Sequence, residues 1–499
     1  MSGQVVVFIV PAMKPDVART LARISRLLFF GAIVVPLAGC VRYHPKPIST
    51  AETGGRLDAR TLSDEGLKRF METNRPGSTA NWPLSKWNAE ELTLAALYYH
   101  PNIRLARADW LSARALIETA RARPNPTLTA GPGYNFSATG TTPWLPFTSL
   151  DWPIETAGKR GRRIEQARYN SDAALLHLVK AAWQARSHVR ATLVDEASAT
   201  FRERALDKQV RLQGELLEFL EKRRAAGAIS GAELAPARLA LQKLRLARTD
   251  ARRQASESRT RVAEALGVPV GALDGIELEF DIRTTWTGSA ELLGREARRR
   301  ALSSRVDVLE ALAEYEVTEA GLRLEVAKQY PDVHINPGYQ LDDGQHKASF
   351  GVSVELPVLN QNQGSIAEAR ARRESAATRV EAIQAGVIAD VDRATAVFRV
   401  AEASLKESEQ IVAVQRKQLE LVEQQSKAGA ADRVDLLSAQ VELAGSETVL
   451  LDGQTRIQQA IGMLEDAVQQ PLDGFEPKAP VLVGSESALN SGQVKGKKP

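Results

Sequence analysis

The sequence predicts a mainly α-helical fold with a small β part, in which a unit of helix, β-hairpin, long helix, turn and helix occurs twice. Three observations support this fold class. Aromatic residues make up 5% and charged residues 25% of the 499, a composition that suits long helices. Two very long segments, 159–226 and 363–428, contain no proline. Each of them follows a pair of segments in which apolar and polar residues alternate, as they do in strands.

The alternating segments predict two β-hairpins, 127–155 and 332–357, that are suited to a membrane. In the strand 332–342 the odd positions, from Val333 to Leu341, are apolar, and the even positions are polar or glycine. A tilted strand needs roughly 9–11 residues to cross a bilayer, with one face toward lipid and the other toward water. For either pair alone, a half-buried hairpin of a soluble domain is the alternative. The presence of two such pairs favours the membrane.

Residues 1–39 are predicted to be a lipoprotein signal peptide. Three arginines precede the apolar segment 27–38, which leads into the sequence Leu-Ala-Gly-Cys that ends at Cys40. A basic region, a short apolar region and small residues at the cleavage site are typical of a secretory signal, and the apolar region is too short to span a bilayer as a helix. The ending resembles a bacterial lipobox, in which the cysteine is acylated. An ordinary signal peptide that happens to contain Cys40 is the alternative, and a start at Met13 stays open.

The first repeat is predicted over 88–267, after an extended, lipid-tethered arm at 40–87 that contains one short helix near 63–72. A helix at 88–123, bent at Pro101, ends before two prolines that cannot continue it. The first hairpin and the long helix 159–226 follow.

The long helix of the first repeat is predicted to end at Gly227, a typical residue after a helix C-terminus. Ser230 and Glu233 then have the spacing of a capping box for the next helix. A segment rich in glycine and proline, 268–289, separates the repeats, and a tail predicted to be disordered, 471–499, follows the second repeat.

The second repeat, 290–470, follows the same plan. A helix is predicted at 290–329, before the second hairpin. Gly429 takes the place of Gly227, and Asp435 that of Glu233, about 202 residues later. The chain is therefore predicted to be a structural duplication.

The helix 363–428 has apolar residues on two faces, which predicts neighbours on two sides. One seven-residue pattern includes Val391, Phe398 and Leu405, and a second stripe includes Val400 and Val414.

Four strands cannot close a barrel, since the smallest bacterial barrels have about eight. Open sheet edges leave unpaired backbone groups, which are costly in lipid. We therefore expect assembly with copies of the same chain, and the strand arithmetic allows two or three.

The two strand-to-helix junctions carry a family resemblance. Residues 152–160 read Trp-Pro-Ile-Glu-Thr-Ala-Gly-Lys-Arg, and 356–364 read Leu-Pro-Val-Leu-Asn-Gln-Asn-Gln-Gly. Together with the duplicated plan, they resemble the TolC-type outer-membrane factor family, and its cobalt–zinc–cadmium efflux (CzcC-like) branch in particular. The resemblance covers nearly all of the mature chain. Ala157 stands where that branch usually has the first glycine of Gly-Gly-Lys-Arg.

The resemblance implies a passive export duct in the outer membrane, lipid-anchored and extending into the periplasm. Family members are homotrimers whose twelve strands form one barrel, continued by a periplasmic α-helical barrel. Their partners are a periplasmic adaptor and an inner-membrane pump, here expected to be of the RND type, with divalent heavy-metal cations such as Co, Zn and Cd as cargo. A duct for drugs or organic solutes is the first alternative. A non-conducting periplasmic coiled-coil lipoprotein is the second, although a pure coiled coil would not need the four strands.

Three sets of residues are candidates for function, beginning with Cys40 as the site of lipid attachment. The second set, at the two helix–helix turns, matches the family's adaptor-docking tips: Gly227, Ile229, Ser230, Glu233, Gly429, Asp432, Val434 and Asp435. The alternative for these is that they are only well-capped turns.

The third set of candidate residues consists of four glutamates near the tips. Glu218 and Glu221 lie three residues apart, as do Glu420 and Glu423 in the second repeat, so each pair shares one helix face. In a trimer they would form an acidic constriction that favours cations. The alternative is a solvated face paired with Lys222, Arg224, Lys417 or Lys427.

Other function classes find little support in the sequence. The net charge of +4 is small and its signs are interspersed, so no nucleic-acid partner is expected. The six histidines form no metal-binding pattern, and a lone His334 facing the lumen would be ordinary. There is no phosphate-binding loop or nucleophile elbow. We therefore expect no cofactor, no metal centre and no enzyme activity.

Overall fold

The computed structural model describes residues 43–137, 140, 143–283 and 294–472, and divides the chain into two compact units, 1–57 and 58–499. In the first unit, the described residues are extended from Tyr43 and then enter helix α2 (Thr50–Asp58). The predicted signal peptide 1–39, Cys40, and nearly all of the predicted tail 471–499 lie outside the described residues.

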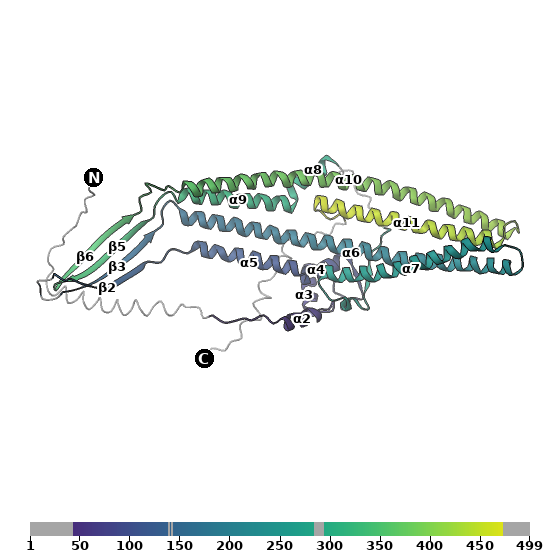
Figure 1. Cartoon of the computed structure of the whole chain (residues 1–499), viewed down its shortest axis with the longest axis horizontal. Coiled ribbons are helices and arrows are strands. Elements are labelled where there is room, and N and C mark those ends of the chain that lie inside the picture. The colour runs from purple at the N-terminus through teal and green to yellow at the C-terminus, as the bar shows by residue number, and fades with distance from the viewer. Residues whose placement is uncertain (1–42, 138–139, 141–142, 284–293, 473–499) are drawn as a thin grey trace. The chain divides into compact units, whose positions relative to one another are not determined.

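The second unit is largely helical, with two hairpins at one end and two helix–helix turns at the other (Figure 1). Its helices are α3 (Glu65–Asn74), α4 (Ala89–Tyr99), α5 (Pro101–Arg121), α6 (Lys159–Ala225), α7 (Gly231–Leu266), η2 (Val270–Leu273), α8 (Arg295–Ser304), α9 (Val306–Ala327), α10 (Gln363–Lys427) and α11 (Arg433–Val468). Its strands are β1 (Lys86–Asn88), β2 (Thr127–Tyr134), β3 (Trp144–Ile154), β4 (Glu277–Glu279), β5 (Val333–Asp342) and β6 (Gln345–Val354). None of the described helices is long and apolar enough to cross a membrane.

The two hairpins pair with each other into one antiparallel four-stranded sheet, in the order β2-β3-β5-β6. Ile335 lies opposite both Trp152 and Val352, so the apolar positions of neighbouring strands line the same face. The polar positions line the other face, because successive side chains of a strand alternate. The predicted alternation is therefore confirmed except in the first half of β3, where Phe147 lies on the polar face opposite Gln340.

The helices continue the order of the strands. Neighbouring pairs in contact are α5 with α6, α6 with α9, and α9 with α10, and each of these helices leads into or out of one strand of the sheet. Toward the far end α7 packs on α6, α11 packs on α10, and α6 packs on α11. The four-stranded sheet and the helices that continue its strands thus form one continuous wall (Figure 1).

The predicted bend at Pro101 is confirmed as a break between α4 and α5. The ring nitrogen of His100 accepts a hydrogen bond from the backbone of Asn102, and Pro101 occupies the first helical turn of α5, where proline is tolerated.

The second repeat breaks at Arg305, so the prediction of one helix over 290–329 is wrong. Arg305 donates to the carbonyl of Ala467, and the backbone N–H of Val306 donates to the side chain of Gln469. Because these contacts come from α11 and the residue after it, a local sequence pattern could not reveal the break.

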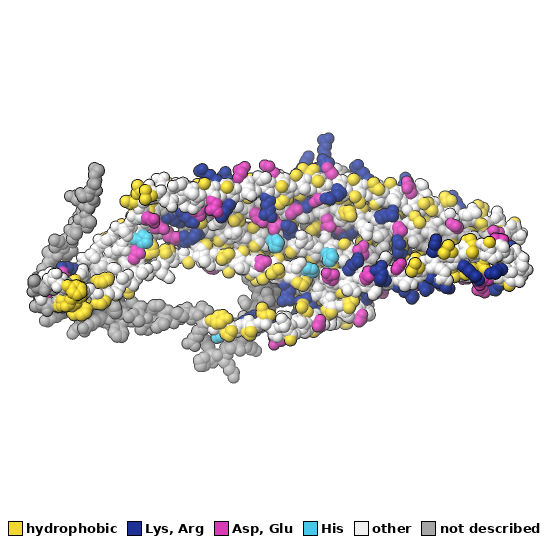
Figure 2. All heavy atoms as spheres, viewed as in Figure 1, with side chains coloured by type: hydrophobic (Ala, Val, Ile, Leu, Met, Phe, Trp, Pro, Cys, Tyr) yellow, Lys and Arg dark blue, Asp and Glu magenta, His cyan; other side chains and the backbone are white. Residues whose placement is uncertain are grey.

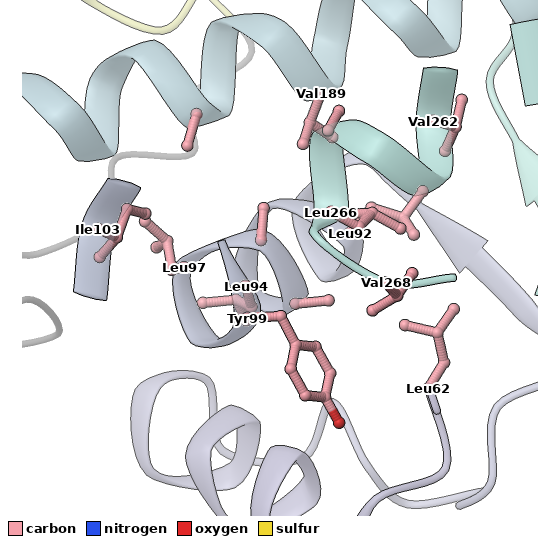
Figure 3. Packing of buried hydrophobic residues seen from close by; sticks show 14 of the residues in the cluster. Leu62, Leu92, Leu94, Leu97, Tyr99, Ile103, Val189, Val262, Leu266 and Val268 are labelled. Atoms are coloured by element: carbon pink, nitrogen blue, oxygen red, sulfur yellow. The ribbon is translucent and has the colours of Figure 1, made fainter. Parts of the chain in front are cut away.

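The arm before the first repeat is folded rather than extended from residue 58 onward, which corrects that expectation. Its Leu62, Leu67, Met71 and Trp87 are buried in one cluster with α4, α6 and the end of α7. Figure 3 shows Leu62 in this cluster, which also includes Leu92 and Leu266. Each such side chain contributes roughly 1.5–3 kcal/mol when fully buried. The arm also supplies β1, which pairs in parallel with β4. Both strands are too short to show a clear period in the sequence.

Candidate functional site

The turn between α6 and α7 is fixed by its own backbone. Gly227 has φ +75°, in the left-handed region that glycine adopts without strain. The N–H of Gly227 donates to the carbonyl of Arg224, and that of Ala228 donates to Arg223, which closes the C-terminus of α6 as a Schellman motif. Ser230 and Glu233 then form the predicted capping box.

The turn between α10 and α11 repeats this construction. Gly429 has φ +77°, and Ala430 donates its N–H to the carbonyl of Gln425. Asp432 accepts hydrogen bonds from the N–H groups of Val434 at 2.7 Å and Asp435 at 3.0 Å. The Asp435 carboxylate accepts from the N–H of Asp432 at 2.9 Å, so this capping box uses two aspartates.

The two turns are joined by an ion pair. The Arg223 guanidinium lies 3.0 Å from the Asp432 carboxylate. The pKa of Asp432 is lowered, first by the backbone N–H of Asp435 and further by Val434 and Arg223. Of the eight predicted tip residues, Ile229 and Val434 are half-buried and the other six are exposed. The two turns thus lie together, with these six residues exposed.

The four predicted glutamates differ in their pairing. Glu218 pairs with Lys222 at 2.7 Å, which lowers the pKa of Glu218, and Glu221 pairs with Arg238 at 2.7 Å. Across the part of the chain that the structure describes, Glu420 and Glu423 have no ion-pair partner. The alternative of a solvated face with ion-paired glutamates therefore holds for Glu218 and Glu221 in the first repeat. In the second repeat, Glu420 and Glu423 form an acidic pair that has no ion-pair partner within the described residues.

The contact between α6 and α11 is polar along its length, a feature that the sequence did not reveal. Its ion pairs have the cation on α6 and the anion on α11: Arg186 and Arg190 with Glu465, Arg202 with Asp452, and Lys208 with Glu447. Gln209 adds a hydrogen bond to the carbonyl of Ala444. The paired residues are more than 200 positions apart in the sequence, so no local pattern predicts their contact. The one available signal was that the two helices carry net charges of opposite sign.

The pair of Arg186 and Glu465 is buried, with side chains 4% and 2% exposed. The contact between α6 and α11 is called the seam below. Its other ion pairs become more exposed toward the tips.

The first junction between sheet and helix is held by polar contacts. Lys159 lies 2.8 Å from the Asp332 carboxylate, and the N–H of Thr156 donates to the same group at 2.9 Å. Glu155 is ion-paired with Arg163. Ala157 has φ +51°, a left-handed conformation that favours glycine, which accounts for the glycine usual there in the CzcC-like branch.

His334 lies on the polar face of the sheet and contacts the Asp151 carboxylate at 2.9 Å. Among the described residues, no group of three or more His, Cys, Asp or Glu side chains could hold a metal ion. The local partner of His334 is therefore Asp151.

Comparisons with known proteins show which family shares this sequence. Residues 93–268 and 297–468 match the family described as outer membrane efflux protein. The cobalt–zinc–cadmium resistance protein CzcC of Cupriavidus metallidurans is 24% identical over 267 residues, which are 53% of this chain and 62% of that protein. The chain thus matches less than two thirds of the length of this relative. The predicted resemblance to the CzcC-like branch is confirmed.

Several solved structures share the fold. The outer membrane protein VceC of Vibrio cholerae is 17% identical with a TM-score of 0.62, covering 77% of this chain and 96% of its own. CusC is 18% identical with a TM-score of 0.62, covering 77% and 92%. A membrane protein of Pseudomonas aeruginosa is 17% identical with a TM-score of 0.63, covering 78% and 91%.

The family match covers both repeats and includes the wall of helices and the two turns. Proteins of this family are passive channels rather than enzymes. The chain belongs to the outer membrane efflux protein family.

Proposed function

We propose that this protein is the outer-membrane exit duct of a tripartite efflux system and passively conducts what an inner-membrane pump delivers. Proteins of the family form trimers and work with adaptor and inner-membrane pump partners. The observation that carries the proposal is the continuous wall of sheet and helices, which is open at both edges and therefore incomplete as one copy.

The open edges support a trimer. In the sheet, β2 and β6 are the outer strands, and in the helical layer, α5 and α10 are the outer helices. α10 carries large exposed apolar side chains along one stripe: Val397, Val400, Ile411, Val414 and Leu421. Such an exposed stripe marks a contact surface. Three copies of the four-stranded sheet give twelve strands, the number found in family trimers, and they would enclose a lumen continued by the helices.

The membrane placement rests on the apolar face of the sheet. Trp152, Phe350 and Val352 are large, apolar and exposed there, whereas the opposite face carries mainly polar residues, with Phe147 as an exception. A membrane barrel has this division between lipid and lumen. The acylated Cys40 would add an anchor, which by itself holds only marginally, so the barrel dominates retention in the outer membrane.

The two tips are the proposed docking surface for a periplasmic adaptor, which would connect the duct to a pump of the RND type. The capping boxes and the pair of Arg223 with Asp432 give this surface a defined shape. Four of the six exposed tip residues have polar side chains that could contribute to docking: Ser230, Glu233, Asp432 and Asp435.

Divalent heavy-metal cations are the proposed cargo. The support is the similarity to a protein named for cobalt–zinc–cadmium resistance and the uncompensated Glu420 and Glu423 near one tip. In a trimer these residues would place six carboxylates near the tube's entrance, which would favour cations.

The acidic pair is tested by the variant E420Q/E423Q in planar bilayers. We expect lower single-channel conductance and weaker cation preference, because six charges leave the entrance. The matched control is E218Q/E221Q, whose carboxylates are already paired, and its effect should be smaller. Unchanged conductance and selectivity in E420Q/E423Q would remove the acidic constriction but leave the duct.

The function as a whole is tested by growth of a deletion strain, with and without the intact gene, on Co, Zn, Cd, Ni, Cu and Ag salts and a drug panel. Selective sensitivity to divalent metals, rescued by the gene, supports the proposed cargo. Sensitivity to drugs alone keeps the duct and overturns the metal assignment. A purified protein that does not conduct in planar bilayers would instead indicate a structural lipoprotein.

A further inference from the structure

We infer that the junction between β6 and α10 is a lipid-binding projection that inserts into the interfacial region of the membrane on the helical side of the sheet. The projection consists of residues 356–359, Leu-Pro-Val-Leu. Leu356, Val358 and Leu359 are 75%, 76% and 96% exposed. Figure 2 shows hydrophobic side chains protruding where the sheet meets α10. The inference rests on the proposed placement of the sheet in a membrane.

The backbone holds these side chains outward. The N–H of Val358 donates to the carbonyl of Leu356 at 2.8 Å, which makes a γ-turn around Pro357. The following N–H groups of Gln361 and Asn362 are satisfied by nearby side chains. The Asn362 amide then donates to the backbone and carboxylate of Glu325 on α9. The apolar projection is therefore fixed from one side by polar residues.

The other repeat provides an internal comparison. Pro357 corresponds to Pro153, and Leu359 therefore corresponds to Glu155. Glu155 is ion-paired with Arg163 and its side chain is 15% exposed. At the position equivalent to Arg163 the second repeat has Ala367. The second junction thus has the exposed Leu359 where the first has an ion-paired glutamate. The apolar projection is therefore present in only one of the two repeats.

The direction of the projection favours lipid over a second copy of the chain. Leu356 lies two residues past the end of β6 and follows Phe350, Val352 and Val354, the apolar face of that strand, at alternate positions of the sequence. Side chains stand perpendicular to a sheet, whereas a neighbouring strand would pair in its plane, along the edge. A short uncharged apolar segment followed by four amide residues also suits the boundary between acyl chains and headgroups.

The test uses cysteine variants of the full chain, labelled with a nitrobenzoxadiazole probe and reconstituted as trimers into phosphatidylcholine vesicles with and without a nitroxide near the headgroups. L359C is the test site. F350C on the apolar face is the positive control, and S349C on the polar face and A157C at the first junction are negative controls. The parent chain, whose cysteine is Cys40, sets the background.

We expect the nitroxide to reduce the emission of L359C by about as much as that of F350C, and to leave S349C and A157C near background. Quenching of F350C without quenching of L359C would overturn the inference and leave the proposed function standing. Absence of quenching at both sites would overturn the membrane placement itself. A disulfide between copies in the variant L359C/N125C would place the projection against a second copy instead and would also overturn the inference.

Discussion

Glu465 is the single residue on which the contact between α6 and α11 depends most. Its carboxylate is buried between Arg186 and Arg190 and also accepts the backbone N–H of Leu472. Removing one partner of a buried ion pair leaves an uncompensated charge, which typically costs about 3–5 kcal/mol. The exposed pairs of the same seam are worth about 0–1 kcal/mol each.

We therefore predict that E465Q lowers the free energy of unfolding by roughly 3 kcal/mol. The measurement is denaturant unfolding in detergent, followed by helical circular dichroism. The matched control is E447Q, which breaks the exposed pair with Lys208 and should cost about 1 kcal/mol or less. Equal losses in the two variants would show that burial does not set the strength of this seam.

At the scale of elements, the N-terminus of α11 depends on Asp432. Its carboxylate satisfies two backbone N–H groups and pairs with Arg223 of the other turn. Replacing an N-cap aspartate by alanine typically costs about 0.5–2 kcal/mol. The capping box of α7 uses Ser230, which is neutral, so the two turns should respond differently to pH.

We predict that D432A lowers the free energy of unfolding by about 1 kcal/mol at neutral pH. The pKa of Asp432 is lowered in the folded protein. Its contribution is therefore present above the ordinary aspartate pKa, near 3.9, and is lost as the pH falls through the lower folded value. Unfolding measured from pH 7 to pH 3 should show the difference between D432A and the parent shrink.

The matched variant S230A removes a neutral hydroxyl that donates to the Glu233 carboxylate, so its cost should change less than that of D432A over the same pH range. A D432A deficit that stays constant down to pH 3 would show that the charge of Asp432 does not contribute.

At the scale of the whole molecule, the exposed stripe of α10 is the surface that the proposed trimer would cover. Val414 is 64% exposed, although apolar residues recur along this face at the spacing of a packed helix. The opposite stripe, with Phe398, Leu405 and Val412, is buried within the chain. One face of α10 is therefore buried within the chain, and the other is exposed.

We predict that V414E prevents trimer formation while the helical content of the chain stays unchanged, because a charge would be buried without a partner between copies. The measurement is light scattering or native electrophoresis, with circular dichroism for the fold. A413E is the control, since Ala413 is exposed and lies off both stripes, and it should remain trimeric. A trimer of V414E as stable as the parent would place the contact between copies elsewhere.

The elements were largely predictable because their signals are local. Alternation identified all four strands of the large sheet, and the absence of proline identified α6 and α10 to within a few residues. Gly227, Ser230 and Asp432 marked helix ends because a left-handed residue and a side-chain cap are needed at fixed positions there. The short strands β1 and β4 were missed, since three residues show no period.

The sequence by itself determined the duplication, the ends of the long helices α6 and α10, and most faces of the strands, because each depends on patterns within a few turns or on the recurrence of such patterns. It also carried the resemblance to a family of ducts. Only the tertiary structure decided that β3 pairs with β5, that α8 and α9 separate at Arg305, and that residues 58–87 join a core. It also decided which glutamates are paired and which side chains at the second junction remain uncovered. Those features depend on contacts between residues far apart in the chain. Each such contact contributes little energy by itself, and only the sum of them in the assembled wall favours one arrangement.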